Sequence, residues 1–311
     1  MSSISNSHPA TAPKVWLITG SSRGLGNALA KAVLAAGHRV VATARRPGDL
    51  AALVAQYGAD RVRAVALDVT DPASARAAVQ QGVDAFGRLD VVVNNAGYGN
   101  VGAIEDVSDD DFRAQIETNF FGVANVTRAA LPVLRTQRSG HFIQIASIGG
   151  RTASPGLAAY QSAKWAVEGF SEVLAKEVAP LGIKVTIVEP GGFRTDWAGS
   201  SMTVQPPRDE YRAVLAPFIG YRDGGQKALG DPAKAAQAIL QIAGIDAPPL
   251  HLLLGSDAVL MAQHTLAARG AEDAQWRALS ESTNADDADV GAWLAALAHL
   301  TGARQQQQQP Q

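Results

Sequence analysis

The stretch from Lys14 to Gly37 reads KVWLITGSSRGLGNALAKAVLAAG, and its order of features decides the fold. Its apolar start, Lys14 to Thr19, is typical of a buried strand, and it leads directly into the glycine-rich turn GSSRGLG. An alanine-rich segment with the composition of a helix follows. A strand, a glycine turn and a helix in this order present free N–H groups at the helix N-terminus to an anion. The stretch therefore predicts the first unit of a dinucleotide-binding α/β fold.

The glycines of this turn are spaced G-x-x-x-G-x-G, which differs from the standard G-x-G-x-x-G fingerprint. Glycine permits a tight turn and lets the backbone approach a phosphate closely. A glycine-rich turn alone is a weak indication, and its place after the first strand strengthens it. The residues that we expect to contact a cofactor here are Gly20, Ser22, Arg23, Gly24, Leu25 and Gly26.

A second apolar run, His38 to Ala44, is followed by Arg45 and Arg46. In NAD-binding sites an acidic residue at the end of this strand accepts hydrogen bonds from the ribose, whereas arginine accommodates the 2′-phosphate of NADP. Ala44 occupies the expected acidic position, and Arg23 in the glycine turn adds a second positive charge. The alternative is a pair of solvated arginines on a loop. Two arginines without an acid favour NADP(H).

Five further apolar runs alternate with helical segments along the chain. This rhythm predicts a single doubly wound parallel sheet of about seven strands with helices on both faces. Asp68 and Val69, at the end of the third strand, are placed to contact an adenine. Pro132 is expected to kink or split the long helix that carries Asn119. The runs are Arg61 to Leu67, Asp90 to Val93, His141 to Ala146, Ile183 to Val188 and Leu250 to Leu254.

The chain is predicted to form one α/β domain, residues 14–255, with extensions at both ends. Residues 1–13 are expected to be a disordered leader, and the glutamine-rich residues 301–311 a disordered tail. Residues 256–300 look helical, with Trp276 and Trp293 expected to pack in a core.

Residues 196–230 mix aromatic residues, prolines and glycines without clear periodicity. This composition is consistent either with a mobile lid over a substrate or with an ordered loop that packs on its own core. The candidate wall residues are Trp197, Met202, Tyr211, Phe218 and Tyr221. Such a wall would suit an amphipathic substrate, such as a steroid, a retinoid or a bulky ketone.

Chemistry is expected in the stretch Ala146 to Glu168, ASIGGRTASPGLAAYQSAKWAVE. Ser147 follows an apolar strand, at the sheet edge where open α/β sheets bind ligands. Tyr160 and Lys164 are four residues apart in a helical segment, so both side chains lie on one face. A neighbouring ammonium favours a phenolate and should lower the tyrosine pKa from about 10. Taken alone, the pair could equally be an amphipathic tip and a solvated charge.

The composition is that of an ordinary soluble globular protein, with 311 residues, 47% hydrophobic and 18% charged, and a net charge of −2. No charge excess points to nucleic acid or a membrane surface as a partner. The sequence has no cysteine, which excludes disulfides, thiolate metal sites and cysteine nucleophiles. The six histidines are scattered, so no metal site is expected. The N-terminus lacks the apolar core of a signal peptide, and a cytoplasmic location is expected.

Together these motifs resemble the short-chain dehydrogenases/reductases over residues 14 to 255. The resemblance implies a Rossmann fold, a nicotinamide cofactor and the interconversion of a carbonyl and an alcohol. The helical extension, together with LHLLLGSDAV, resembles a hydroxysteroid-dehydrogenase-like branch found in bacteria. The matching motifs arrive in the family's order, as TGSSRGLG (19–26), NNAG (94–97), Asn119, Ser147, YQSAK (160–164) and PGGFRT (190–195).

The resemblance also implies a role for individual residues. Tyr160 would be the general acid/base, Lys164 would hold the nicotinamide ribose and lower the tyrosine pKa, and Ser147 would bind the substrate oxygen. Asn119 would support a water relay to bulk solvent. The cofactor would further contact Asn95, Ala96 and Gly97 on its adenosine side and Pro190, Gly191 and Thr195 at its nicotinamide end.

Three functions remain open at this point. The first is an NADP(H)-dependent oxidoreductase acting on a ketone, an aldehyde or the corresponding alcohol. The second is an NAD-preferring secondary-alcohol or hydroxysteroid dehydrogenase on the same fold. The third is a nucleotide-binding sensor without catalysis, which would be expected to lack Tyr160 or Lys164. Relatives often assemble through the helices that hold Asn119 and Tyr160, so a homodimer or homotetramer is possible.

Overall fold

A computed structural model describes residues 12–198, 202–223 and 228–302. Residues 1–11 and 303–311, which hold most of the predicted leader and tail, lie outside the described residues. The remaining two gaps, 199–201 and 224–227, fall within the segment 196–230.

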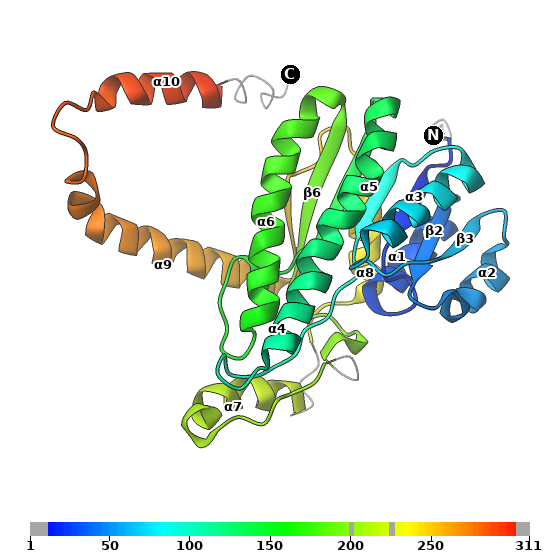
Figure 1. Ribbon diagram of the computed structural model, residues 1–311, viewed down its shortest axis with the longest axis horizontal. Helices are drawn as coiled ribbons and strands as arrows, with labels where there is room; N and C mark the ends of the chain where they lie inside the picture. Colours follow the sequence, from blue (N-terminus) through cyan, green and yellow to red (C-terminus); the bar gives the residue numbers. More distant parts are fainter. Residues whose placement is uncertain (1–11, 199–201, 224–227, 303–311) are drawn as a thin grey trace, which may run out of the picture. The chain divides into compact units, whose positions relative to one another are not determined.

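A seven-stranded parallel sheet forms the centre of the fold, with the strand order β3-β2-β1-β4-β5-β6-β7 (Figure 1). Its register places Trp16 of β1 opposite Val40 of β2 on one side and Val91 of β4 on the other. The order reverses between β1 and β4, and a ligand crevice is expected at such a point. The predicted doubly wound α/β fold is confirmed. The strands are β1 Val15–Ile18, β2 Arg39–Ala44, β3 Val62–Ala66, β4 Val91–Asn94, β5 Gly140–Ile145, β6 Ile183–Pro190 and β7 His251–Leu254.

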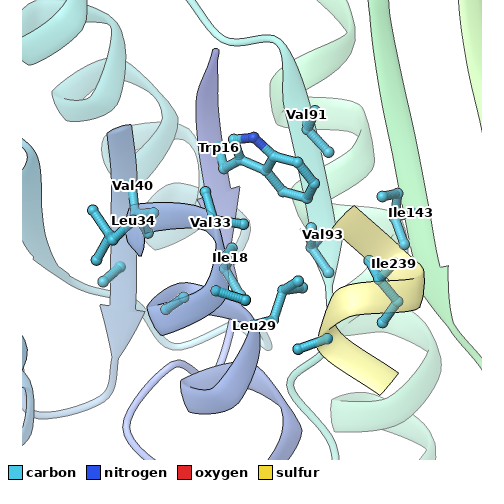
Figure 2. Close-up of a cluster of buried hydrophobic side chains, with 14 of the residues drawn as sticks. Trp16, Ile18, Leu29, Val33, Leu34, Val40, Val91, Val93, Ile143 and Ile239 are labelled. Carbon is cyan, nitrogen blue, oxygen red and sulfur yellow. The ribbon is translucent and has the colours of Figure 1, made fainter. Parts of the chain in front are cut away.

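One face of the sheet is covered by α1 (Gly24–Ala35) and α8 (Pro232–Ile242), which pack against each other. Side chains alternate along a strand, so Trp16 and Ile18 of β1 both point to this face. They meet Leu29 of α1 and Ile239 of α8 in a fully buried apolar cluster (Figure 2). This contact fixes α1, and with it the glycine turn, against the sheet.

The opposite face carries the apolar sides of three helices, α3 (Pro72–Phe86), α5 (Gly122–Gln137) and α6 (Ala158–Val178). Val15 and Leu17, the residues of β1 that alternate with Trp16 and Ile18, are buried there. The sheet is therefore buried on both faces, as a parallel sheet requires. A short helix α2 (Ala51–Tyr57) precedes β3.

The helix that carries Asn119 is interrupted, but not at Pro132. Helix α4 (Asp109–Ile116) passes into a π-helical turn, η2 (Glu117–Phe121), and then into α5. Pro132 lies inside α5 and does not split it, so the prediction of a break there was wrong. The irregular turn instead falls on Asn119, and π-helical turns occur frequently at functional sites.

The segment 196–230 contains more helix than its sequence indicated. A 3-10 turn, η5 (Asp196–Ala198), and helix α7 (Asp209–Asp223) account for most of its described residues. Met202 is buried against Val101 and Leu157, and Phe218 packs on the same cluster. Met202 and Phe218 thus belong to a small core, and a lid over a substrate stays a prediction. The Tyr221 side chain lies outside the described residues.

The chain divides into two compact units, residues 1–263 and 264–311, and the division falls within α9 (Ser256–Glu281). The start of α9 belongs to the first unit, where Ala258 and Ala262 pack on Ile148. The second unit holds the rest of α9 and α10 (Val290–Gly302). Trp276 is 54% exposed and Trp293 is 63% exposed, so the expectation that both pack in a core was wrong.

Candidate active site

Tyr160 and Lys164 lie on the first turns of α6, directly beyond the carboxyl end of β5. Both side chains are buried, and the Lys164 Nζ atom is 5.7 Å from the centroid of the Tyr160 ring. Ser147 follows β5 and caps the 3-10 turn η3 (Ile148–Gly150), since its Oγ accepts a hydrogen bond from the Gly149 N–H at 3.0 Å. The fold thus brings the three predicted groups to one edge of the sheet.

Lys164 is held by a hydrogen bond in which Nζ donates to the Ile145 carbonyl at 2.8 Å. That carbonyl belongs to the last residue of β5, so the bond ties α6 to the strand that precedes Ser147. Burial lowers the pKa of Lys164 to about 8, and the charge of Glu168 acts in the opposite direction. The charged form of Lys164 therefore lowers the stability of the folded state.

The expected fall in the pKa of Tyr160 does not occur in this structure. Burial raises the pKa of Tyr160 to about 12, and the neighbouring Ser147 hydroxyl offsets only part of that rise. A phenolate loses its hydration when it is buried, and this loss outweighs any help from Lys164, whose own charge burial disfavours. Tyr160 is consequently held as a neutral phenol, the form that can donate a proton.

Asn119 lies in the π-helical turn η2 and is fully buried. Its Nδ2 donates to the carbonyls of Tyr98 and Gln115, each at 2.8 Å, while its Oδ1 accepts from the Tyr98 N–H at 3.1 Å. A Cβ atom placed on Gly97 would lie 2.5 Å from Asn119 Oδ1 and 3.8 Å from Lys164 Nζ. Asn119 and Lys164 therefore face the same backbone position.

The glycine turn after β1 is shaped by contacts that only glycine permits. Gly20 and Gly24 have φ angles of +68° and +56°, and a Cβ atom on Gly26 would meet the Gly20 carbonyl oxygen at 2.3 Å. Asn95 closes the turn, since its Nδ2 donates to the Thr19 carbonyl at 2.8 Å.

Asn95 and Ala96 also donate their backbone N–H groups to the Thr19 hydroxyl, at 2.8 and 2.9 Å. These contacts make both residues supports of the glycine turn. Asn95 thus stabilises a turn through hydrogen bonds of its own side chain and backbone. A direct contact of either residue with a cofactor stays a prediction.

The N-terminus of α1 fits an anionic phosphate. Arg23 stands at the N-cap, and its side chain makes no cap hydrogen bond to the first N–H groups of the helix. Arg23 and Arg45 are exposed, and Arg45 has no ion-pair partner among the residues that the structure describes. Ser22, in the turn, is half-buried, whereas Leu25 packs on the core. Arg46 instead pairs with Asp49 at 3.3 Å.

Asp68 and Val69 lie after β3, as expected, but their polar groups are already partnered. The Asp68 carboxylate accepts hydrogen bonds from the N–H and the hydroxyl of Thr70, at 3.0 and 2.7 Å. Val69 is buried, and its carbonyl accepts from Asn125 Nδ2 at 3.0 Å. Their local role is to hold the end of β3, and contact with an adenine stays a prediction.

The loop after β6 reaches the glycine turn. Gly191 donates its N–H to the Leu254 carbonyl at 2.9 Å, next to Pro190, which ends β6. Thr195 lies close to Gly24, because a Cβ atom on Gly24 would be 3.7 Å from the Thr195 Cβ. The loop is thereby placed between the turn and Tyr160.

Of the predicted wall residues, Trp197 is placed to face the reacting groups. The ring of Trp197 lies 5.1 Å from that of Tyr160, measured between centroids. Tyr211, by contrast, donates its hydroxyl to Glu105 at the surface. Met202 and Phe218 pack in the small core under α7.

A second polar cluster behind Lys164 was missed at the sequence level. It joins Arg151, Glu168, Glu189 and His251, which come from four separate parts of the chain. One signal was available, since Glu168 follows Lys164 by four residues and therefore shares its helical face.

Among the described residues, no helix has the length and apolar character needed to span a membrane.

Comparison with known proteins gives consistent matches. The family model described as short chain dehydrogenase matches residues 14–205. The oxidoreductase BOA17 of Botryotinia fuckeliana is 53% identical over 268 residues, covering 86% of this chain and 98% of the relative. A 3-ketodihydrosphingosine reductase of Bacteroides thetaiotaomicron is 37% identical over 247 residues, covering 78% and 88%.

Two solved structures share the fold. A short-chain dehydrogenase from Streptomyces avermitilis has a TM-score of 0.82 and 42% identity, covering 88% of this chain and 99% of its own. An alcohol dehydrogenase from Thermococcus sibiricus, complexed with 5-hydroxy-NADP, has a TM-score of 0.65 and 26% identity, covering 78% and 95%. The chain belongs to the short-chain dehydrogenase family and is an oxidoreductase.

Proposed function

We propose that this oxidoreductase reduces a ketone with NADP(H), with Tyr160 as the general acid. The observation that carries the proposal is the neutral Tyr160 phenol, buried beside Ser147 at the carboxyl edge of the sheet. The nicotinamide, when bound, supplies the hydride. Negative charge then grows on the substrate oxygen, and two hydroxyl donors in a dry site stabilise it. Tyr160 gives that oxygen its proton.

Lys164 and Asn119 support the proton donor in this proposal. Lys164 is placed to hold the nicotinamide ribose, and its ammonium favours the phenolate that remains after the proton leaves. Asn119 lies on the other side of Gly97 and would support a water relay to solvent. A positioned acid of this kind contributes on the order of 10²–10⁴ in rate.

The preference for NADP(H) rests on charge at the carboxyl ends of β1 and β2. Arg23 and Arg45 are exposed there, while the position of Ala44 carries no acid that could accept hydrogen bonds from a ribose. The Thermococcus sibiricus neighbour was solved with 5-hydroxy-NADP, which is in line with this preference. An NAD-preferring alcohol or hydroxysteroid dehydrogenase remains the alternative.

The substrate class in this proposal is a ketone with an apolar chain. Trp197 stands against Tyr160, and the apolar cluster of Val101, Leu157 and Met202 lies beside it. One relative is named for the reduction of 3-ketodihydrosphingosine, an amphipathic ketone. Membership of the hydroxysteroid-dehydrogenase-like branch, a cytoplasmic location and a dimeric or tetrameric state stay predictions from the sequence.

Steady-state oxidation of the reduced cofactor tests the proposal. We expect the protein to consume NADPH with long-chain 3-oxo compounds, and kcat/KM to be at least tenfold lower with NADH and with short ketones. The alcohol product is identified by mass spectrometry. A clear preference for NADH would contradict the arginine argument, and no turnover with any ketone would contradict the substrate class.

A further inference from the structure

A buried group of acids lies behind Lys164, on the side away from Tyr160's proposed substrate. Glu168 follows Lys164 by one turn of α6, Glu189 lies near the end of β6, and His251 begins β7. His251 Nδ1 is 2.8 Å from Glu189 Oε1 and 3.6 Å from Glu168 Oε2. Arg151 donates to the same Glu189 oxygen at 2.7 Å.

This group holds more carboxylate than its one arginine can balance. Glu189 is fully buried and Glu168 is 8% exposed. Both oxygens of Glu168 and the second oxygen of Glu189 are buried, and they have no hydrogen-bond partner in the part of the chain that the structure describes. Burial, and then the charge of Glu189, raise the pKa of Glu168 well above its usual range. A proton between the two carboxyl groups would give one orphaned oxygen of each a hydrogen bond and bring the pair to a single negative charge, opposite Arg151.

A metal ion is the other way to satisfy these oxygens, and the geometry is less favourable to it. Nitrogen and oxygen ligands about 2.1 Å from a tetrahedral zinc ion stand roughly 3.4 Å apart. His251 Nδ1 and Glu189 Oε1 are closer than that, at hydrogen-bonding distance. The Arg151 guanidinium also occupies the same carboxylate oxygen and would repel a second cation.

We propose that Glu168 and Glu189 share one proton at neutral pH, and that the charge on this pair controls the ammonium of Lys164. Glu168 is then a positioning residue for proton transfer, and this role rests on the proposed function of Lys164. The groups that face Glu168 are Lys164 and Glu172 on α6, Arg151 after η3, Glu189 on β6 and His251 on β7.

The effect of the pair on Lys164 has a definite sign. While the pair holds its proton, Glu168 is neutral and gives the buried ammonium little support. When alkaline pH removes the shared proton, a full negative charge stands one helical turn from Lys164 and favours its charged form. Two partly exposed side chains connect the pair to solvent. His251 is 30% exposed, and Glu172, which is 48% exposed, lies 3.5 Å from His251 Nε2.

Infrared spectroscopy of the ligand-free protein tests the shared proton without using activity. At pH 7 we expect a carboxylic-acid C=O band that disappears in Glu168→Gln and persists in Glu177→Gln. Glu177 is the matched control, because it is an exposed glutamate on the same helix. If the wild-type protein lacks the band, or Glu168→Gln retains it, the shared proton is wrong whether or not the protein reduces ketones.

The pH dependence of kcat/KM tests the control of Lys164. Glu168→Gln removes the negative charge that alkaline pH would create one helical turn from the ammonium, so the alkaline limb should move down by about 1 pH unit. Glu189→Gln removes the neighbour that keeps Glu168 protonated, so the limb should move up. A merely structural role would not move the two variants in opposite directions, and a common direction would overturn the proposal.

The metal alternative is tested on the same proteins. Isothermal titration calorimetry of the wild-type protein with Zn²⁺ at pH 7 should show no stoichiometric binding at the cluster. One bound Zn²⁺ that is lost in Glu168→Gln, together with the absence of the infrared band, would make the cluster a metal site and overturn the proton-sharing proposal.

Discussion

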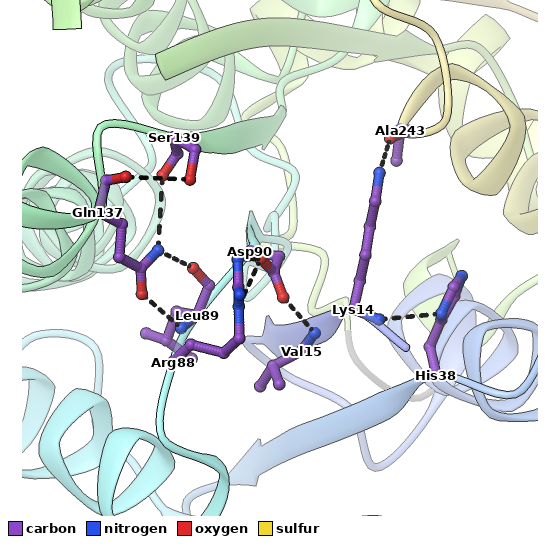
Figure 3. A network of polar contacts seen from close by, with 9 residues as sticks. All are labelled: Lys14, Val15, His38, Arg88, Leu89, Asp90, Gln137, Ser139 and Ala243. Carbon is purple, nitrogen blue, oxygen red and sulfur yellow. Dashed lines mark hydrogen bonds and ion pairs between the residues drawn. The ribbon is translucent and has the colours of Figure 1, made fainter. Parts of the chain in front are cut away.

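The two ends of the parallel sheet carry polar groups of similar kind but treat them differently. At the amino ends, Asp90 accepts from the Val15 N–H at 2.8 Å and from Arg88, while Lys14 donates to the Ala243 carbonyl at 2.7 Å (Figure 3). Gln137 closes the network by hydrogen bonds to the backbone of Leu89. Each of these groups has a partner within the chain.

At the carboxyl ends, several polar groups are exposed, and others are buried where their charged forms are destabilised. The first turn of α1 has no side-chain cap, and Arg45 has no ion-pair partner among the described residues. Tyr160 and Lys164 are buried with pKa values shifted toward their neutral forms. The comparison teaches that the polar groups at the amino end stabilise the fold, whereas those at the carboxyl end are free for the ligand that the proposed function requires.

The largest expected effect is the loss of the proton donor. Tyr160→Phe should lower kcat/KM by about 10²–10⁴ while changing the free energy of unfolding by less than about 1 kcal/mol. The substitution removes the hydroxyl group, but the ring that packs against Trp197 stays. Single-turnover kinetics and urea unfolding measure the two quantities, and cofactor affinity is the control. Full activity in this variant would show that another group supplies the proton.

Replacement of the buried cation should separate stability from activity. Burial depresses the pKa of Lys164 from 10.5 to about 8, so the folded state carries the full cost of the charge below pH 8 and none above pH 10.5. Lys164→Met should therefore abolish turnover yet stabilise the fold by up to about 3 kcal/mol at pH 6.

The gain in Lys164→Met should shrink as the pH rises through 8. Urea unfolding at pH 6, 8 and 10 measures it, with Lys176→Met as an exposed control on the same helix. If Lys164→Met were less stable than wild type at pH 6, the hydrogen bond to Ile145 would be worth more than the desolvation of the ammonium.

The amino end should respond in the opposite way. Asp90→Ala leaves the buried Val15 N–H without its acceptor and should destabilise the protein by about 2 kcal/mol, with kcat/KM unchanged. Arg88→Ala removes the exposed partner of the same carboxylate and should cost less than about 1 kcal/mol. Thermal unfolding compares the two variants. A drop in kcat/KM for Asp90→Ala would mean that the two ends are coupled.

The smallest expected effect concerns cofactor choice. Arg45→Ala should raise KM for NADPH about fivefold and leave KM for NADH unchanged, because one exposed charge on a phosphate is worth about 1 kcal/mol. Arg46→Ala is the matched control, since Arg46 is engaged with Asp49. Equal changes with both cofactors would show that Arg45 does not contact a 2′-phosphate.

The strands and the doubly wound parallel sheet could be predicted from the sequence because they depend on local patterns. Apolar runs such as Lys14 to Thr19 mark buried strands, and the glycine turn after the first run fixes where the first helix begins. The spacing of Tyr160 and Lys164 places both on one helical face whatever the rest of the fold does.

Burial was not predictable in the same way. Trp276 and Trp293 lie in segments that look helical, yet both are exposed, because burial depends on what packs over a helix. The irregular helical turn at Asn119 likewise gave no signal, whereas Pro132, the obvious helix breaker, lies inside α5. These features are set by distant parts of the chain.

By itself, the sequence determined the doubly wound sheet, the glycine turn and the set of candidate side chains, since periodicity and spacing act over a few residues. Only the tertiary structure decided the protonation of those side chains. Desolvation depends on every atom that covers a group, which is why Tyr160 is held as a neutral acid rather than the expected acidic phenol. The same holds for Glu168, whose neighbours Glu189 and His251 come from other strands.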